Sequence, residues 1–311
     1  MFRALILGFL CLLAATAPAQ RYKPQTKLLV GTNWLARNIQ DPSLVLLHIG
    51  DDRTRYDQAH IPGARFVAMS ELVVTRDGIP NELPPVADLT KLVQRLGINE
   101  KSRVILYDEE LGMAAARGYV TFDYLGLGDN AGLLNGQLRT WQAEGRPTTA
   151  KAPADAKPSA FEPTPRPEVI ATIELIRKVA DGTCDTTTTL VDARPPAEFT
   201  GAMPGQDIDR GGHIPNAESI YWKQAILSEA KPVLRSDEEL HKLFPMPGKD
   251  AKLVTYCRSG RQASFNYFVM RYLGYPVQLY DGSFYEWSHQ PENAVLEGTA
   301  VKTSPTPAAG S

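Results

Sequence analysis

Short apolar runs alternate along this chain with longer segments whose apolar residues recur at helical spacing. The runs at 103–108 (RVILYD) and 252–257 (KLVTYC) are typical of buried parallel strands. Each is followed by a segment with the apolar spacing of a helix, at 114–125 and 263–273. Strands that alternate with helices predict an α/β fold, in which a mostly parallel sheet is flanked by helices on both faces.

The same pattern occurs twice in the chain. Residues 44–64 and 190–217 each contain an apolar run, a charged segment with an aromatic residue, and a motif that begins HIP and ends in alanine. Further on, NGQLRTW at 135–141 matches DGSFYEW at 281–287. Together with the paired strands and helices, these blocks follow one another in the same order. They predict two tandem copies of one α/β unit.

The composition between and after the copies sets the predicted boundaries. We place the first domain at residues 26–145 and the second at 168–292. Residues 146–167 are rich in Pro, Ala, Thr and Lys and have no apolar period, which predicts an interdomain linker. Residues 293–311 lack a core pattern and predict a flexible tail.

The first 19 residues have the features of a cleaved export signal. Arg3 precedes an apolar run at 5–15, which is too short to span a bilayer as a helix, and residues 17–19 (APA) form a cleavage pattern. We therefore expect a periplasmic or secreted protein with no membrane attachment after cleavage. The alternatives are a retained membrane anchor and a lipoprotein attached through Cys11.

Charge and cysteine content exclude some functions. The net charge is -2, with 33 basic and 35 acidic residues, so we expect no basic surface for nucleic acid. After cleavage only Cys184 and Cys257 remain, which is too few for a disulfide scaffold, and the histidines show no metal-ligand spacing with them. We predict no metal and no cofactor. Cys184 lies in a polar run typical of an exposed loop, where a resolving-thiol role is a minor alternative.

The residues repeated in both copies favour structural roles. His60 and His213 stand in the two HIP motifs, and they recur in the copy that has no cysteine at the later strand end. That recurrence favours hydrogen bonding within the fold over catalysis. Trp141 and Trp287 occupy equivalent positions and are expected to anchor the two cores.

The segment at 254–264 (VTYCRSGRQAS) carries the most informative chemistry. An apolar strand ends at Cys257, a short loop with Gly260 follows, and then a helix begins. Such a loop directs successive backbone N–H groups and the positive end of the helix at one point, where Arg258 and Arg261 add charge. We expect a lowered pKa and a largely ionised thiol. The thiolate would attack a sulfane sulfur and carry it as a persulfide. The alternative is a buried cysteine that acts as a small hydrophobe.

These motifs together resemble the rhodanese superfamily, in the tandem-domain form of thiosulfate and 3-mercaptopyruvate sulfurtransferases. The resemblance covers roughly residues 28–291, and it is carried by VDARPPAEF at 191–199, GHIPNA at 212–217, CRSGRQ at 257–262 and YDGSFYEW at 280–287. It implies a six-residue active-site loop, here called the cysteine loop (residues 257–262), in the second copy.

The resemblance also assigns roles to single residues. It implies that Cys257 is the catalytic group and that the other loop residues hold the substrate, namely Arg258, Ser259, Gly260, Arg261 and Gln262. Asp192 and Ser283 are expected to brace the site. The first copy is implied to be a non-catalytic partner.

Two departures change this picture. The position matching the cysteine in the first copy is Asp108, followed by an acidic and apolar segment at 109–113. A carboxylate cannot carry a persulfide and would repel an anionic donor, so the first domain is expected to supply packing and one wall of the cleft. Glu198 stands where the tandem enzymes have a donor-binding arginine. Arg194 or Arg210 would substitute for that arginine or pair with Glu198, and Arg194 is our candidate for substrate binding.

The sequence thus predicts an enzyme that moves sulfane sulfur from a donor such as thiosulfate or 3-mercaptopyruvate to cyanide or a thiol, including a thiol on a protein. A phosphatase or arsenate reductase of the related cysteine-loop kind is disfavoured, because Ala263 stands where that larger loop has its arginine. An exported persulfide carrier or redox-sensing module with little turnover is the alternative of another class. Steady-state transfer to a small acceptor separates it from the enzyme. A purely structural role would leave the basic cysteine loop unexplained.

Overall fold

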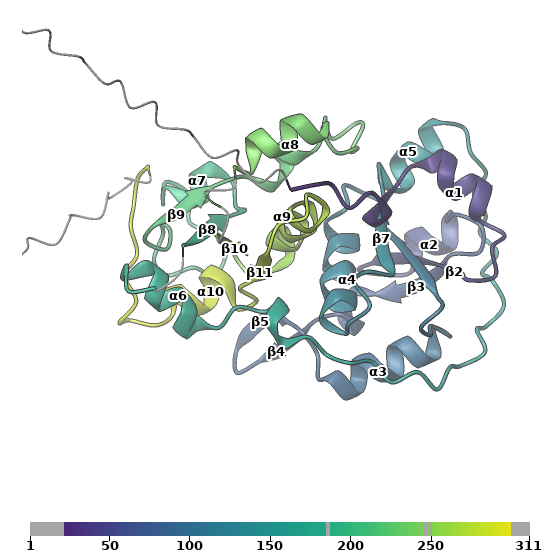
Figure 1. The fold of residues 1–311 in the computed structure, drawn as a ribbon, viewed down its shortest axis with the longest axis horizontal. Coiled ribbons are helices and arrows are strands. Elements are labelled where there is room, and N and C mark those ends of the chain that lie inside the picture. Colours follow the sequence, from purple (N-terminus) through teal and green to yellow (C-terminus); the bar gives the residue numbers. More distant parts are fainter. Residues whose placement is uncertain (1–21, 185–186, 246–247, 249–250, 300–311) are drawn as a thin grey trace, which may run out of the picture.

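The structure is a computed structural model that describes residues 22–184, 187–245, 248 and 251–299. The chain forms two lobes, one for each copy of the repeat (Figure 1). The predicted signal at 1–19 and the last residues of the predicted tail lie outside the described residues. Within the described part, no helix combines the length and the apolarity that a membrane crossing needs.

The first lobe follows the predicted alternation of strands and helices. Its strands are β1 (Leu29–Val30), β2 (Leu44–Gly50), β3 (Arg65–Ala68), β4 (Val74–Arg76), β5 (Ile79–Glu82), β6 (Arg103–Tyr107) and β7 (Ala131–Leu134). Its α-helices are α1 (Thr32–Asn38), α2 (Thr54–Gln58), α3 (Val86–Arg95), α4 (Met113–Tyr124) and α5 (Gln137–Ala143). Short 3-10 turns lie at Thr26–Leu28 and Met69–Glu71.

The second lobe repeats this order with fewer strands. Its strands are β8 (Thr188–Asp192), β9 (Ala217–Ser219), β10 (Lys252–Tyr256) and β11 (Val277–Leu279). Its α-helices are α6 (Ile173–Ala180), α7 (Pro196–Phe199), α8 (Asp237–Leu243), α9 (Arg261–Tyr272) and α10 (Ser283–Ser288). The 3-10 turns are η3 (Pro167–Val169) and η4 (Trp222–Ala225).

Both main sheets are parallel, as predicted. The first has the strand order β1-β7-β6-β2-β3 and the second has β11-β10-β8-β9. An antiparallel hairpin, β4–β5, leaves the first lobe and reaches toward the second (Figure 1). The central strands β6 and β10 sit at equivalent places, so the loops after them leave equivalent edges of the two sheets.

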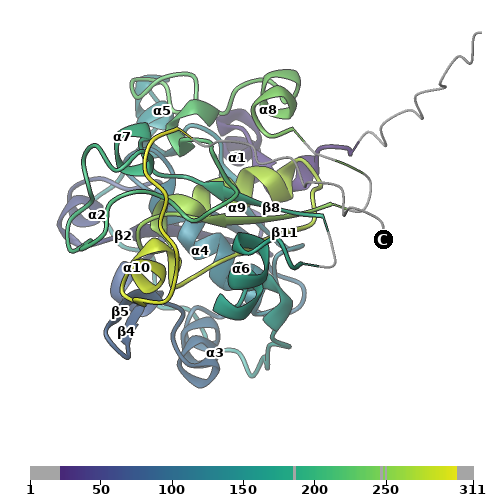
Figure 2. The same ribbon diagram turned by 90° about the vertical axis from the view of Figure 1, so that its left-hand side faces the viewer.

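Helices cover both faces of each sheet because side chains along a strand point alternately to opposite faces. In β2, Leu47 and Ile49 join one apolar cluster with α3 and α4, whereas Leu46 joins another with α1 and α5. In β10, Leu253 faces α9 while Val254 packs with α6 and α10. Figure 2, in which the second lobe faces the viewer, shows α6, α7 and α10 around its strands. The predicted fold class is confirmed.

One apolar core continues across the two lobes. Helices α4 and α9 pack on each other between the sheets, and buried side chains of both belong to the same cluster (Figure 1). Tyr119 of α4 meets Phe268 of α9 edge to face, with ring centroids 4.9 Å apart. The lobes are therefore joined through the two helices that follow the two equivalent loops.

The repeated histidines and tryptophans have the structural roles that we expected. The rings of His60 and His213 are buried, and their Nδ1 atoms lie 2.7 Å and 2.9 Å from the carbonyl oxygens of Tyr56 and Phe199. Each histidine also stacks on that aromatic ring, with centroids 3.8 Å apart. The indoles of Trp141 and Trp287 are buried, and each donates its N–H to a backbone carbonyl at 2.8 Å.

The predicted linker and tail are more attached to the fold than their composition suggested. The linker pairs with the first lobe, where Thr149 bridges His60 and Ser159 donates to the Ile98 carbonyl. Beyond residue 292 the chain still packs on the second lobe, because Leu296 bridges His213 and Asn293 is buried. Hydrogen bonds of the backbone attach these polar segments to the lobes. The spacing of apolar residues does not reveal such bonds, so the sequence pattern did not predict the attachment.

Candidate active site

The cysteine loop leaves the end of β10 and enters α9 through a glycine. Gly260 has φ +85°, a conformation that side chains of L-residues rarely adopt. A Cβ at this position would lie 3.0 Å from Asp281 Oδ1 and 3.2 Å from the Asp281 carbonyl oxygen. Both the backbone conformation and the close approach therefore require glycine, and they fix the path of the loop around Cys257.

Cys257 sits at the centre of a cradle of backbone N–H groups. The residue is 1% exposed, and the N–H groups of Ser259, Gln262 and Ala263 point at its sulfur. Three donors that converge at a helix N-terminus favour a negatively charged sulfur there, whether a thiolate or a persulfide. This arrangement agrees with the prediction for the loop backbone.

The lowered pKa that we expected for the Cys257 thiol is wrong, because the structure raises this pKa. Burial raises the pKa of Cys257 above its ordinary value, and the N–H groups of Ala263, Ser259 and Gln262 only partly oppose that effect. The physical reason is desolvation, because a sulfur removed from water loses the solvation that an ion needs. The nearby Asp192 carboxylate raises the pKa further. In the resting protein the cradle holds a thiol that must lose its proton before it attacks.

Ser283 has the bracing position that we predicted. Its Oγ accepts the N–H of Cys257 at 3.3 Å and donates to the Tyr280 carbonyl at 2.9 Å. The carbonyl of Cys257 in turn accepts the N–H of Phe284 at 2.9 Å. The first residues of α10, which follows β11, thus hold the backbone of Cys257 in place.

Asp192 and Arg194 form a buried pair. The guanidinium of Arg194 donates from Nη2 to Asp192 Oδ2 at 2.6 Å, and also to the Gly212 carbonyl at 2.8 Å. Both side chains are essentially unexposed, at 0% and 1%. The structure therefore places Arg194 where a dissolved donor does not reach it, which differs from the substrate-binding position that we expected. Asp192 Oδ1 also accepts the backbone N–H of Arg194 at 2.9 Å and so orders the turn after β8, which agrees with the bracing role that we expected.

Arg210 does not replace the missing donor-binding arginine either. Its guanidinium donates to the carbonyls of Ser288, Gln290 and Asn293, at 2.8, 2.7 and 2.8 Å. These are the carbonyls at and beyond the end of α10, where a cation compensates the unpaired acceptors of the last helical turn. Arg210 therefore secures the loop at 200–212 to the second lobe.

The two arginines of the cysteine loop both lie beside carboxylates. Arg261 pairs with Asp51 of the first domain, its Nη2 lying 3.1 Å and 3.2 Å from the two carboxylate oxygens. Arg258 lies close to Glu198, because a Cβ on Gly205 would be 2.9 Å from Arg258 Cδ and 3.0 Å from Glu198 Oε2. Burial raises the pKa of Glu198, and the positive charges of Arg194 and Arg258 oppose the shift.

The first domain grips the cysteine loop at two points that the sequence did not indicate. Asn81, from the β4–β5 hairpin, donates to the Ser259 hydroxyl at 2.9 Å. Arg117 of α4 is unexposed and pairs with Asp281, Nη1 to Oδ1 at 2.5 Å and Nη2 to Oδ2 at 3.2 Å. Asp281 is the residue against which Gly260 packs. Asp281 lay in the matched repeat block, but no local pattern pointed to its partner in the other domain.

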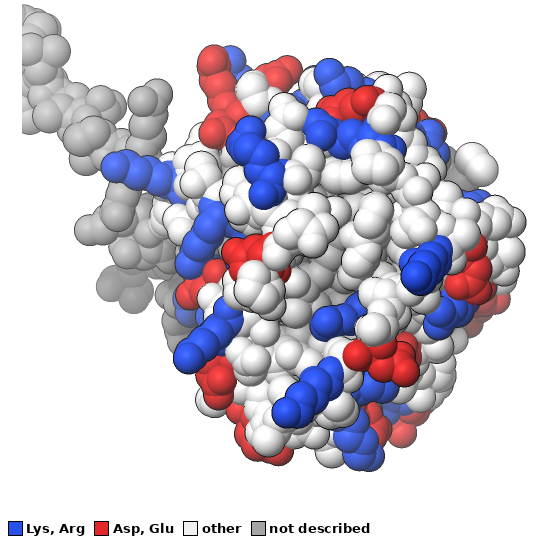
Figure 3. Space-filling model, turned by 90° about the vertical axis from the view of Figure 1, so that its right-hand side faces the viewer, with Lys and Arg blue, Asp and Glu red and all other residues white. Residues whose placement is uncertain are grey.

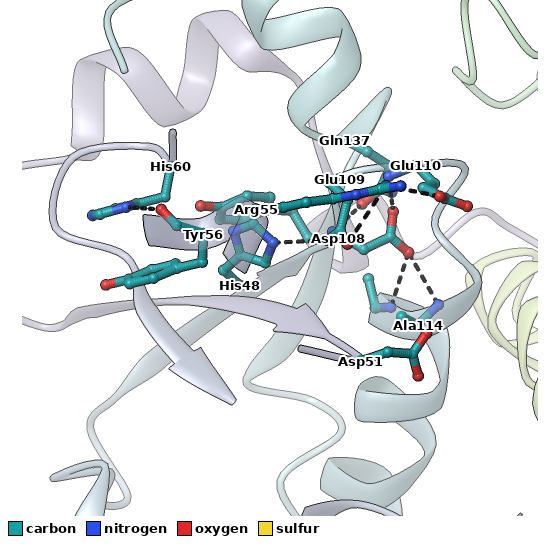
Figure 4. Close-up of polar contacts among 12 residues, drawn as sticks. His48, Asp51, Arg55, Tyr56, His60, Asp108, Glu109, Glu110, Ala114 and Gln137 are labelled. Atoms are coloured by element: carbon teal, nitrogen blue, oxygen red, sulfur yellow. Dashed lines mark hydrogen bonds and ion pairs between the residues drawn. The ribbon is translucent and has the colours of Figure 1, made fainter. Parts of the chain in front are cut away.

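The equivalent loop of the first domain, here called the counterpart loop (residues 108–114), holds a carboxylate in the same cradle. Asp108 accepts the N–H groups of Glu110 and Gly112 on Oδ1 and those of Ala114 and Ala115 on Oδ2, at 2.9 to 3.3 Å (Figure 4). Burial raises its pKa to about 6, against the effect of these donors. A fixed carboxyl group thus occupies the place that the cysteine sulfur has in the second domain, which agrees with a non-catalytic first copy.

A cavity of about 460 Å³ lies between the two loops. Arg261 lines it from the cysteine loop, together with Trp222 and Lys223 of η4 and, from the first domain, Ile49, Gly50, Asp51, Asp52, Arg55, Asp108, Glu109, Glu110, Leu111, Met113 and Ala114. Trp222 packs on Phe265 of α9, one turn beyond the cysteine loop. The first domain therefore supplies one wall of the cleft beside the loop, and that wall is acidic.

The described part of the chain contains two cysteines. Neither of these two cysteines, Cys184 and Cys257, forms a disulfide bond within the described residues. Among the residues with described positions, no three His, Cys, Asp or Glu side chains gather in a way that could hold a metal ion. On the face shown in Figure 3, basic and acidic side chains are interspersed.

The chain belongs to the rhodanese family. The model of the rhodanese-like domain matches it twice, at residues 31–144 and 173–290, one match in each lobe. The two matches account for the tandem fold.

Individual relatives carry names that indicate different functions. The chain is 35% identical over 281 residues to the "Sulfur carrier protein TtuD" of Thermus thermophilus, covering 85% of this chain and 94% of that protein. It is 31% identical over 280 residues to a Mycolicibacterium smegmatis protein named "Putative thiosulfate sulfurtransferase", covering 85% and 95%. The crystal structure of the 3-mercaptopyruvate sulfotransferase SseA from Escherichia coli matches with a TM-score of 0.71 at 26% identity, covering 82% of this chain and 98% of that one.

Proposed function

We propose that this protein is an exported sulfurtransferase that moves sulfane sulfur from a donor such as thiosulfate or 3-mercaptopyruvate to cyanide or a thiol, through a persulfide on Cys257. The observation that carries the proposal is the N–H cradle around the Cys257 sulfur, held between β10 and α9. In the first domain the same cradle is filled by Asp108. The persulfide chemistry is therefore assigned to the second domain alone.

The cradle explains both halves of the reaction. The Cys257 thiol loses its proton, the thiolate attacks the outer sulfur of the donor, and the bond from that sulfur to its carrier breaks. The carrier leaves with the electron pair, as sulfite in the case of thiosulfate. The new terminal sulfur bears the negative charge, which the N–H groups of Ser259, Gln262 and Ala263 stabilise. The acceptor then attacks this terminal sulfur, and the Cys257 thiolate is regenerated.

A second candidate is a persulfide carrier with little turnover. The relative named "Sulfur carrier protein TtuD" supports it, as does the absence of the donor-binding arginine at Glu198. In this candidate a thiol-bearing protein is the acceptor, and Cys257 passes on its sulfur only to that partner.

One assay separates these candidates. Thiosulfate and 3-mercaptopyruvate are each offered to the mature, reduced protein with cyanide as acceptor, and thiocyanate is followed beside the Cys257→Ser variant. Turnover that disappears in Cys257→Ser establishes the enzyme. A mass gain of one sulfur atom on Cys257 without turnover establishes the carrier. Equal thiocyanate formation by the variant would refute the Cys257 mechanism.

The export proposal has a separate test. We expect the mature chain to begin at Gln20, because residues 17–19 form the cleavage pattern. Expression of the full chain in a bacterium, followed by fractionation and N-terminal sequencing, would show a periplasmic product that starts there. A cytoplasmic product that retains Met1 would contradict export.

A further inference from the structure

Each arginine of the cysteine loop lies beside a carboxylate that comes from outside the loop. Arg261 is bound by Asp51, which lies after β2 in the first domain, with Nη2 at 3.1 and 3.2 Å from the two oxygens. Arg258 and the half-buried Glu198 flank Gly205. Asp51 therefore neutralises much of the charge of Arg261, and the nearby Glu198 carboxylate opposes the charge of Arg258 without a direct ion pair.

The cavity beside the loop adds no surplus of positive charge. Of its basic lining residues, Arg55 donates to Glu110 at 2.9 Å and Lys223 pairs with Glu229 outside the lining. Asp52 lines the same space. The cavity is thus lined by more carboxylates than basic side chains. A second negative charge on a donor would therefore be repelled there.

The backbone cradle can compensate one negative charge. Its N–H groups converge on the sulfur of Cys257, where the persulfide charge develops. A donor with a single charge on its sulfane sulfur presents that charge to the cradle. Thiosulfate carries a second charge on its sulfonate oxygens, and those oxygens need a cation, whereas a carboxylate opposes the charge of each loop arginine in this site.

We propose that Asp51 and Glu198 make the site selective for sulfane-sulfur donors of a single negative charge, the thiosulfonates and thiol persulfides, over the dianion thiosulfate. The inference rests on the proposed function, since it assigns a donor class to the same cysteine. Asp51 is then a specificity determinant that the non-catalytic domain supplies to the catalytic loop.

Methanethiosulfonate and thiosulfate form a matched pair of probes. Both carry a sulfane sulfur on an oxidised sulfur atom, and they differ by one negative charge. With methanethiosulfonate the Cys257 thiolate takes the outer sulfur, the S–S bond of the donor breaks, and methanesulfinate leaves with the electron pair. With thiosulfate the same step releases sulfite. Oxidation states balance in both reactions without another reactant.

The experiment measures kcat/KM for both donors with cyanide as acceptor, in the full mature chain. We expect wild type to prefer methanethiosulfonate by about tenfold or more at low ionic strength. Asp51→Asn frees Arg261, so kcat/KM for thiosulfate should rise about threefold while that for methanethiosulfonate changes little. Glu198→Gln should act in the same direction through Arg258, and the double variant should combine the two effects.

Two control variants separate pairing from general electrostatics. Asp52→Asn removes a charge from the same cavity without releasing an arginine, since its carboxylate accepts the N–H of Thr54. Asp57→Asn removes an exposed carboxylate of α2 that pairs with Arg53 outside the cavity. We expect Asp57→Asn to leave the donor ratio unchanged and Asp52→Asn to shift it less than Asp51→Asn does.

The outcomes are distinguishable. A donor ratio that Asp51→Asn and Glu198→Gln leave unchanged, or an equal shift in Asp52→Asn and Asp51→Asn, would overturn the selectivity while leaving the sulfurtransferase intact. Absence of Cys257-dependent transfer from both donors in wild type would instead refute the proposed function. A shift that is confined to thiosulfate and fades as salt is added supports the inference, because salt screens exposed charge pairs.

Discussion

The cysteine loop and the counterpart loop have the same backbone design but hold different groups. Each follows the central strand of a parallel sheet and enters a helix through a glycine with positive φ, Gly260 in one and Gly112 in the other. In each, N–H groups from the start of the helix converge on one side chain, Cys257 or Asp108. The N–H groups therefore offset part of the cost of burying an anion in both lobes, and a single side chain decides whether that place can carry a sulfur atom.

The charges around the two loops are reversed. In the first domain Arg55 precedes the aromatic Tyr56 and lies against the acidic Glu109 and Glu110. In the second domain Glu198 precedes the aromatic Phe199 and lies beside the basic Arg258. In each lobe the helix after the first long strand, α2 or α7, thus places a charge beside the loop that is opposite to the charge on the loop. The two lobes therefore bring opposite charges together at equivalent positions, with reversed polarity.

The largest expected effect converts one loop into the other. Cys257→Asp would place a carboxylate in the second cradle, as in the first domain, where four N–H groups bind it. We expect transfer to fall by at least about a thousandfold, because a carboxylate carries no persulfide. Thiocyanate formation and circular dichroism would be measured together. Residual transfer in a folded Cys257→Asp protein would mean that another thiol takes part.

A large loss of stability is expected where the first domain grips the second. Arg117→Met would leave the buried Asp281 without its ion-pair partner, which should cost about 3–5 kcal/mol of unfolding free energy. The matched control is Lys91→Met, which breaks the exposed pair with Asp88 and should cost less than about 1 kcal/mol. Urea unfolding would measure both. Similar costs in the two variants would show that the interdomain pair does not hold the lobes together.

Ser283 and Gln137 accept equivalent backbone N–H groups in the two loops, so their variants should lose similar stability but differ in activity. Ser283→Ala removes the acceptor of the Cys257 N–H, so we expect a loss of about 1–2 kcal/mol and a fall in kcat/KM of about tenfold. Gln137→Ala removes the acceptor of the Asp108 N–H in the first domain. It should cost similar stability with little change in kcat/KM. A fall in kcat/KM that is as large in Gln137→Ala would show that the counterpart loop also shapes the catalytic cleft.

The last prediction concerns the ionisation of Cys257 in the unmodified protein. Because burial raises the pKa of the thiol, the thiolate fraction should still be growing as pH rises through 9. The rate of alkylation by iodoacetamide should therefore increase about tenfold per pH unit from pH 6 to 8, with no plateau near neutrality. The reagent reacts with Cys184 as well, so modification of Cys257 is followed by peptide mass spectrometry. A plateau below pH 7 would restore the lowered pKa that the sequence suggests.

Local patterns in the sequence determined the secondary structure, the two lobes and the loop around Cys257. The period of apolar residues predicts the strands and helices because it records which faces are buried. The duplicated blocks predict two lobes, and the strand–cysteine–glycine–helix order predicts the cradle around Cys257. The replacement of the cysteine by Asp108 likewise predicts that the first lobe is non-catalytic. Each of these features depends on residues that lie close together along the chain.

Tertiary structure decided the rest, since it depends on residues far apart in the chain and on removal from water. The pairing of Arg117 with Asp281, and of Arg261 with Asp51, joins the two domains and leaves no local trace in either segment. Arg194 is basic in sequence, but burial against Asp192 withdraws it from any donor. The pKa of Cys257 is set by how fully the sulfur is desolvated, and flanking arginines do not reveal that quantity.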